Sequence, residues 1–251
     1  MKSRLIAALD VPTADQALEL VAALRNEVGM VKVGSQLFTA AGPDIVRAIV
    51  RSDVPVFLDL KFHDIPNTVA EAAVAATRLG VRILNVHAAG GPEMMQRTAD
   101  AVTKAALSEG LVRPAVIAVT VLTSSDEATL VATGIKNLPE EQVIKLALLA
   151  EQNGMDGLVA SPLEVAAIRS AISRQGFLLV TPGVRPAGAS YDDQKRVMSP
   201  AEAVAAGADY VVMGRSIISA KDPVAAARRI AVEMAGALGE IPTDRQELQH
   251  G

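Results

Sequence analysis

The chain has no cysteine and no tryptophan, and only 2% of its 251 residues are aromatic. Without cysteine it can form neither a disulfide framework nor a thiolate metal site. This excludes small extracellular domains that depend on disulfide bridges, and we expect a cytoplasmic protein. Because 50% of the residues are hydrophobic but few are aromatic, the core must be built from Ala, Val, Leu and Ile. Such a core is typical of buried parallel strands covered by amphipathic helices.

The sequence also lacks an excess of positive charge and long hydrophobic runs. Its formal net charge is -4, whereas general nucleic-acid binding requires a basic face. The charge-free stretches fall well short of the roughly 18 apolar residues that a transmembrane helix needs. The apolar stretch near the N-terminus meets Asp10 and Pro12 too early to be the centre of a signal peptide. We therefore expect neither a nucleic acid nor a membrane as a partner.

A repeat of roughly 30 residues runs through the chain, in which a short aliphatic segment precedes an Ala-rich stretch with helical spacing. Eight segments show this pattern: Leu5–Leu9, Met30–Val33, Val54–Leu60, Ile83–Val86, Ala115–Val121, Gly157–Ala160, Phe177–Val180 and Tyr210–Met213. Eight strand–helix units in 251 residues predict an α/β fold, a single (β/α)8 TIM barrel, which we assign to residues 1–239. The polar residues 240–251 are expected to form a C-terminal tail.

Four of the expected helix starts carry Ser or Thr followed three residues later by Glu or Gln, the capping box that satisfies free N–H groups in a first helical turn. The pairs are Thr13 with Gln16, Ser124 with Glu127, Ser161 with Glu164, and Ser199 with Glu202. One long irregular stretch, residues 183–198, separates the seventh strand from its helix. Loops of this length in compact domains are often active-site lids, so this stretch is a candidate functional loop.

Catalytic residues of such barrels lie at the carboxyl ends of the strands, and Asp59 is unusual because it lies inside a strand between two leucines. Side chains alternate along a strand, so Asp59 and Lys61 share one face while Leu58, Leu60 and Phe62 share the other. If the leucines meet the helices, the two charges point into the barrel. A single pair of this kind is equally compatible with a purely structural ion pair.

Two further charges favour chemistry over structure. Lys32 ends the second strand, which neighbours the third, and Asp64 follows three residues after Lys61. Together they suggest an alternating array of Lys32, Asp59, Lys61 and Asp64, in which the carboxylates keep the lysines protonated and stay ionised themselves. Such an array is suited to delivering a proton to carbon while repelling a substrate anion.

The run from Asp59 to Thr68, Asp-Leu-Lys-Phe-His-Asp-Ile-Pro-Asn-Thr, resembles the signature of the orotidine 5'-phosphate decarboxylase family in its bacterial form. Five shorter motifs match in the family's order: Ala8-Leu9-Asp10, Val31-Lys32-Val33-Gly34, Asn85-Val86-His87-Ala88, Thr181-Pro182-Gly183-Val184-Arg185 and Met213-Gly214-Arg215. The resemblance covers about residues 5 to 230. It implies conversion of orotidine 5'-monophosphate to UMP in pyrimidine synthesis, with no metal or other cofactor.

The resemblance also implies a role for each matching residue. Lys61 would protonate C6 as carbon dioxide leaves, with Asp59 and Asp64 flanking the carboxylate and Lys32 completing the charge network. The substrate-binding set would be Asp10 and Thr68 at the ribose hydroxyls, Thr120 at the pyrimidine, Arg185, Gln194, Gly214 and Arg215 at the phosphate, with Lys32 and Asp59 beside the reacting centre. The partner subunit would supply Asp64 and Thr68, which implies a homodimer with shared active sites.

The residues themselves support the phosphate assignment, because the loops after strands seven and eight are a frequent phosphate site of barrels and arginine offers a planar fork of donors. Two alternatives stay open. One is a magnesium-dependent relative that acts on sugar phosphates, and the other is a barrel that binds a nucleotide without turning it over. His63 and His87 are not predicted to hold a metal, because the chain lacks a clustered acid set beside them.

Overall fold

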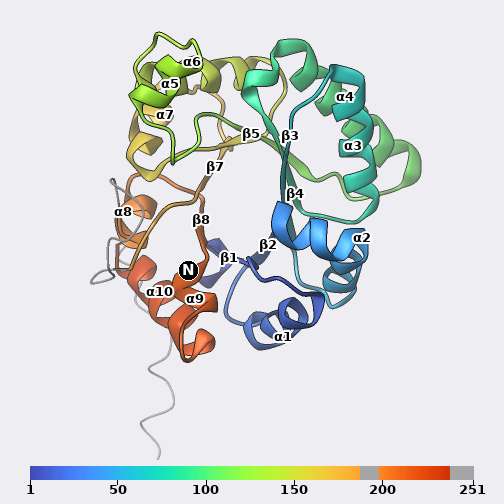
Figure 1. Cartoon of the computed structure of the whole chain (residues 1–251), viewed down its shortest axis with the longest axis vertical. Coiled ribbons are helices and arrows are strands. Elements are labelled where there is room, and N and C mark those ends of the chain that lie inside the picture. Colours follow the sequence, from blue (N-terminus) through green and yellow to red (C-terminus); the bar gives the residue numbers. More distant parts are fainter. Residues whose placement is uncertain (187–197, 238–251) are drawn as a thin grey trace, which may run out of the picture.

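The computed structural model describes residues 1–186 and 198–237. In this part of the chain eight parallel strands form a closed barrel in sequence order, with the helices around it (Figure 1). The strands are β1 Leu5–Ala8, β2 Met30–Gly34, β3 Val56–Phe62, β4 Ile83–His87, β5 Ala115–Val119, β6 Gly157–Val159, β7 Leu178–Thr181 and β8 Tyr210–Met213. The predicted TIM barrel is confirmed. The predicted tail, residues 240–251, and Gln194 lie outside the described residues.

The helices cover the outside of the barrel and link successive strands. They are α1 Ala14–Leu24, α2 Ser35–Arg51, α3 Pro66–Arg78, α4 Pro92–Glu109, α5 Glu127–Ala132, α6 Pro139–Gln152, α7 Val165–Ala171, α8 Pro200–Ala205, α9 Arg215–Ile218 and α10 Pro223–Ala237. Short 3-10 turns at Lys2–Arg4, Ala88–Gly90 and Pro162–Glu164 are η1, η2 and η3. No helix in the described ranges is long and apolar enough to cross a membrane.

Two of the four predicted capping boxes are present, at Ser161 and Ser199, and at a third position Thr13 caps α1 with its own side chain alone. The Thr13 and Ser199 side chains accept hydrogen bonds from the backbone N–H groups three residues on, and Ser161 pairs with Glu164 at η3. The prediction at Ser124 was wrong. There α5 begins two residues later than expected, and the Asp126 carboxylate caps it by accepting from the Thr129 N–H.

The side chains of the strands form two apolar layers, one inside the barrel and one outside it, and these layers support the charged residues of the site. Side chains from alternating strand positions, including Phe57 and Val119, fill the inside of the barrel, and a larger layer packs between the strands and the helices. Leu58 belongs to this outer layer, and Leu60 and Phe62 pack against it. The predicted alternation along β3 is therefore confirmed. Burial of each such side chain contributes about 1.5–3 kcal/mol, so the barrel gives the charged residues above it a firmly packed base.

Candidate active site

A cavity of about 330 Å³ opens at the carboxyl ends of the strands. Apolar side chains such as Phe57 and Val119 belong to its lining, and charged side chains come from several strands and loops. Among the residues that the structure describes, four cations line it, Lys32, Lys61, Arg185 and Arg215, against two carboxylates, Asp10 and Asp59. The surplus of positive charge in a partly enclosed space favours an anionic ligand.

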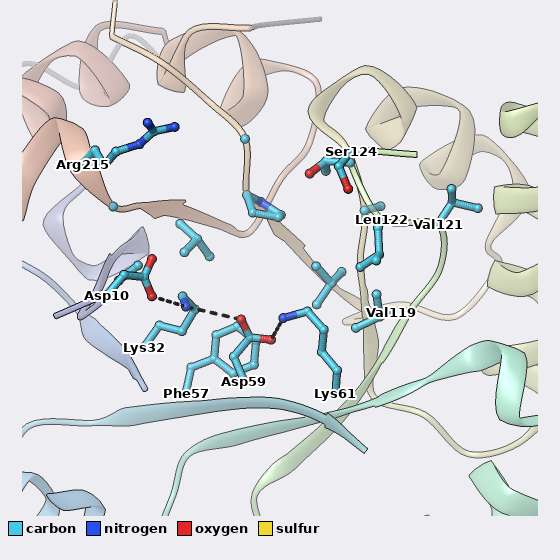
Figure 2. A pocket seen from close by; sticks show the side chains of 18 of the residues that line it. Asp10, Lys32, Phe57, Asp59, Lys61, Val119, Val121, Leu122, Ser124 and Arg215 are labelled. Atoms are coloured by element: carbon cyan, nitrogen blue, oxygen red, sulfur yellow. Dashed lines mark hydrogen bonds and ion pairs between the residues drawn. The ribbon is translucent and has the colours of Figure 1, made fainter. Parts of the chain in front are cut away.

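Asp59 stands between two lysines in a continuous row of opposite charges, which Figure 2 shows along one side of the cavity. Lys61 Nζ donates to Asp59 Oδ1 at 2.7 Å, and Lys32 Nζ lies 3.4 Å from Asp59 Oδ2. Lys32 Nζ also donates to Asp10 Oδ1 at 3.0 Å. The structure thus brings Asp10, Lys32, Asp59 and Lys61 together from three neighbouring strand ends of one chain.

The surroundings of Asp59 keep its carboxyl ionised. Burial alone raises the pKa of Asp59, but the charges of Lys32 and Lys61 and the hydrogen bonds from Lys61 and Asn85 outweigh it, and the net pKa is lowered. Because the shift is downward from an ordinary value of 3.8, Asp59 carries its negative charge at neutral pH. A fixed negative charge therefore lies 2.7 Å from the Lys61 ammonium at the edge of the cavity.

Lys61 has an unusual backbone. Its φ of 52° is in the left-handed region, which a residue with a side chain occupies at a cost of about 1–3 kcal/mol. The pairing of β3 with β4 shifts register at this point, between Leu58 and Phe62. Such bulges bend a strand and redirect a side chain, and they are common next to active sites. Here Lys61 itself lies within the bulge.

The last residue of β2, Gly34, has no side chain, and its surroundings explain why. A Cβ at this position would lie 2.9 Å from Lys32 Nζ and 3.6 Å from Asp10 Oδ1. The first distance is shorter than a carbon normally approaches another atom, so a side chain here would press on the Lys32 ammonium. Gly34 therefore leaves room for the Lys32–Asp10 ion pair.

Another part of the cavity is lined by the segments after β7 and β8. Gly183 and Arg185 follow β7, and Gly214 and Arg215 follow β8. In Figure 2 Arg215 lies on the side of Asp10, away from Lys61. Two arginines with planar donor groups can hold a group with several anionic oxygens, such as a phosphate, at a distance from Lys61.

The profile of the orotidine 5'-phosphate decarboxylase / HUMPS family matches residues 3–230. The chain belongs to this family. The resemblance predicted from the sequence motifs is thereby confirmed, and this family member carries all six motifs within the matched residues.

Relatives within the family match along nearly the whole chain. The orotidine 5'-phosphate decarboxylase of Trichlorobacter lovleyi is 55% identical over 233 residues, which cover 93% of this chain and 95% of the relative. That of Syntrophotalea carbinolica is 54% identical over 239 residues, covering 95% and 98%. The crystal structure of orotidine 5'-phosphate decarboxylase from Lactobacillus acidophilus superposes with a TM-score of 0.80 at 38% identity, over 92% of this chain and 98% of that one.

Two predicted site residues of this family member lie away from its own cavity. Asp64 and Thr68 are exposed and do not belong to the cavity lining. The Asp64 carboxylate accepts a hydrogen bond from the Ile65 N–H at 2.6 Å, and the Ile65 side chain is 67% exposed. Asp64 therefore does not join the row formed by Lys32, Asp59 and Lys61 within a single chain.

Thr120 is also placed differently from the prediction. It is buried, and its hydroxyl donates to the Val159 carbonyl at 3.2 Å instead of lining the cavity. Val119 faces the inside of the barrel, so alternation turns the next side chain away. The hydroxyls that this segment offers to the cavity belong to Thr123 and Ser124, which the sequence reading missed. Their position just beyond the end of β5 was the available signal.

His63 and His87 form a pair beside the site, with ring centroids 5.4 Å apart. Burial lowers the pKa of His87, and His63 and Lys61 lower it further, against the opposing effect of Asp59. His87 is therefore neutral at pH 7. In the described ranges no three His, Asp or Glu side chains gather as a metal site would need. The absence of a metal requirement stays a prediction.

Proposed function

We propose that this protein converts orotidine 5'-monophosphate to UMP by removing the C6 carboxylate as carbon dioxide. The observation that carries the proposal is the row Asp10, Lys32, Asp59 and Lys61 at one side of a cavity with surplus positive charge. The substrate carries two anionic groups, a phosphate and a carboxylate. Relatives that are 54–55% identical over almost their full length bear the name of this activity.

In the proposed reaction the bond between C6 and the carboxylate carbon breaks, and its electron pair stays on C6. Lys61 then donates a proton from Nζ to C6, and solvent returns a proton to the neutral amine. Asp59 holds the ammonium in place through its 2.7 Å hydrogen bond until the proton is transferred. Because Asp59 is ionised, it also faces the substrate carboxylate with a like charge. Lys32 balances Asp59 from the other side.

The size of the electrostatic terms favours stabilisation of the transition state over repulsion of the substrate. Two like charges about 4 Å apart repel by roughly 4 kcal/mol at an effective dielectric constant of 20. Enzymes lower barriers by up to about 23 kcal/mol. Repulsion between Asp59 and the carboxylate is therefore a minor part, and attraction between the Lys61 ammonium and the carbanion at C6 supplies a larger one.

We further propose that Arg185, Gly214 and Arg215 hold the 5'-phosphate, together with Gln194, and that Asp10 binds a ribose hydroxyl. The separation of Arg215 from Lys61 in the cavity supports this, because the phosphate and C6 lie at different ends of the nucleotide (Figure 2). The hydroxyls of Thr123 and Ser124 are available to the pyrimidine.

We propose that the active protein is a homodimer in which Asp64 and Thr68 complete the partner's site. Their exposure outside the cavity of their own chain supports this, as does the exposed Ile65 beside them, an apolar side chain suited to a subunit interface. The predicted cytoplasmic location stays a prediction.

The direct test is to mix the purified protein with orotidine 5'-monophosphate and follow the ultraviolet absorbance change that accompanies UMP formation. We expect stoichiometric UMP and carbon dioxide. The Asp59→Asn variant is the matched control, because it keeps the shape of the side chain and removes the charge between the two lysines. A nucleotide-binding protein without activity would bind the substrate and leave the absorbance constant.

A magnesium-dependent relative is the second candidate, and removal of metal separates it from the proposal. We expect full activity after exhaustive dialysis against a chelator, because the reacting charges in the described cavity are the lysines and aspartates themselves. The measurement is the initial rate before and after dialysis, with and without added magnesium. A rate that disappears and returns with magnesium would favour the metal-dependent relative.

Arg215→Ala is expected to lower kcat/KM by about 10- to 10²-fold, the change that corresponds to one lost hydrogen bond to a charged group. Binding energy from the phosphate serves the transition state, so kcat should fall together with a rise in KM. On orotidine, which lacks the phosphate, the variant and the wild type should differ little. Arg97→Ala, an exposed arginine paired with Glu93 on α4, is the control. Equal losses on both substrates would contradict the phosphate assignment.

A further inference from the structure

Asn85 is a buried side chain that lies beside the reacting row without lining the cavity. It is on β4, and its exposed fraction is 0%. Because it does not belong to the cavity lining, it is not placed to touch a ligand there. A buried amide needs hydrogen-bond partners, so its contacts show what it does.

Asn85 lies opposite the bulge of β3. The two strands pair at Leu58 with Leu84 and again at Phe62 with Val86. Between these two pairs β3 contains residues 59–61, whereas β4 contains Asn85 alone. A regular ladder of backbone hydrogen bonds cannot match three residues to one, so the backbone groups of the bulge need other partners.

The Asn85 side chain supplies one of those partners, to the Lys61 backbone, and it also binds the Asp59 carboxylate at the other side of the bulge. Its Oδ1 accepts a hydrogen bond from the Lys61 backbone N–H at 2.8 Å. Its Nδ2 donates to Asp59 Oδ1 at 2.6 Å, the same oxygen that accepts from Lys61 Nζ at 2.7 Å. Only one orientation of the amide fits, because the N–H needs an acceptor and the ionised carboxylate needs a donor.

These bonds close a ring that holds Lys61 at both ends. The ring runs from the Lys61 backbone N–H through the Asn85 amide to the Asp59 carboxylate, and from there to the Lys61 ammonium. Asn85 thereby links the left-handed backbone of Lys61 to the position of its Nζ. Aspartate in place of Asn85 lacks the donor and repels Asp59, and leucine makes neither bond.

We propose that Asn85 is a positioning residue that keeps the β3 bulge in shape and so aims the Lys61 ammonium at the reacting carbon. The proposal rests on the proposed decarboxylase function and adds a residue to it. Its effect must appear in the chemical step, because a displacement of about 1 Å in a reacting group can cost 10²-fold in rate. Ground-state binding should change little, because the residues assigned to the phosphate come from the segments after β7 and β8.

The test compares Asn85→Leu and Asn85→Asp with the wild type. We expect kcat to fall by about 10²-fold in both variants, the cost of a misplaced reacting group. The KM of orotidine 5'-monophosphate and the Kd of UMP should stay within about threefold of the wild-type values, since the loss lies in the transition state alone. Thr98→Val is the control, because Thr98 is also fully buried and hydrogen-bonded, on the outer helix α4. It should leave kcat unchanged at a similar loss of thermal stability.

The possible results distinguish a failure of this inference from a failure of the proposed function. A wild type that forms no UMP would refute the proposed function, and no variant is needed to see it. If the wild type is active and Asn85→Leu keeps kcat within about threefold, Asn85 does not position Lys61 and the inference fails. Equal losses in binding and turnover that follow thermal stability would also overturn it, as would failure of both variants to fold, because the role would then be structural.

Discussion

Lys61→Ala is expected to abolish decarboxylation while the barrel stays folded. Loss of a positioned proton donor alone costs about 10²–10⁴-fold in rate, and the variant also loses the ammonium that faces the carbanion. Asp59 does not become an isolated buried charge, because Lys32 Nζ stays 3.4 Å away and Asn85 still donates to it. We therefore expect a modest loss of thermal stability and continued binding of UMP.

Three measurements check this expectation: the rate of UMP formation, the affinity for UMP by calorimetry and the melting temperature. Lys104→Ala, which removes an exposed lysine on α4, controls for the change in net charge. Lys61→Arg keeps the positive charge but replaces the compact ammonium with a planar guanidinium that holds its protons, so it should also be inactive. Near-normal turnover of the alanine variant would mean that another group protonates C6.

The fold could be predicted from the sequence because it depends on local periodicity. Each of the eight aliphatic segments overlaps a strand, and the alternation of Leu58, Leu60 and Phe62 against Asp59 and Lys61 holds in the structure. A mixed core of aliphatic residues and a helix after every strand leave few other arrangements. The alternation of side chains along a strand is therefore enough to predict that Asp59 and Lys61 lie on the same face.

The arrangement around Lys61 could not be predicted, because it depends on how two strands pair. Nothing within the run from Asp59 to Thr68 indicates a bulge, and the residue that bridges it, Asn85, belongs to another strand. The position of Thr120 could not be predicted for a related reason. Whether a residue at a strand end faces the cavity depends on where that strand stops, and sequence patterns locate strand ends only to within about two to four residues.

Whether Asp64 serves its own active site or the partner's can be tested directly by mixing subunits. In one chain its carboxylate is exposed and lies outside the cavity that Lys32 and Lys61 line. If Asp64 serves the partner's site, each site of the dimer combines Lys61 of one subunit with Asp64 of the other. Lys61→Ala and Asp64→Ala should then each be nearly inactive as homodimers, and a mixture of them should regain activity.

The expected recovery follows from the two-fold symmetry of the dimer. Random exchange of subunits makes about half of the dimers mixed, and each mixed dimer has one site with both lesions and one with neither, so activity should reach about a quarter of wild type. The control mixes Lys61→Ala with Lys32→Ala, whose side chains line the same cavity of one chain. Every mixed site then keeps one lesion, and no recovery is expected. If the Asp64 mixture behaves like this control after proven exchange, Asp64 acts within its own subunit, and the shared site is wrong.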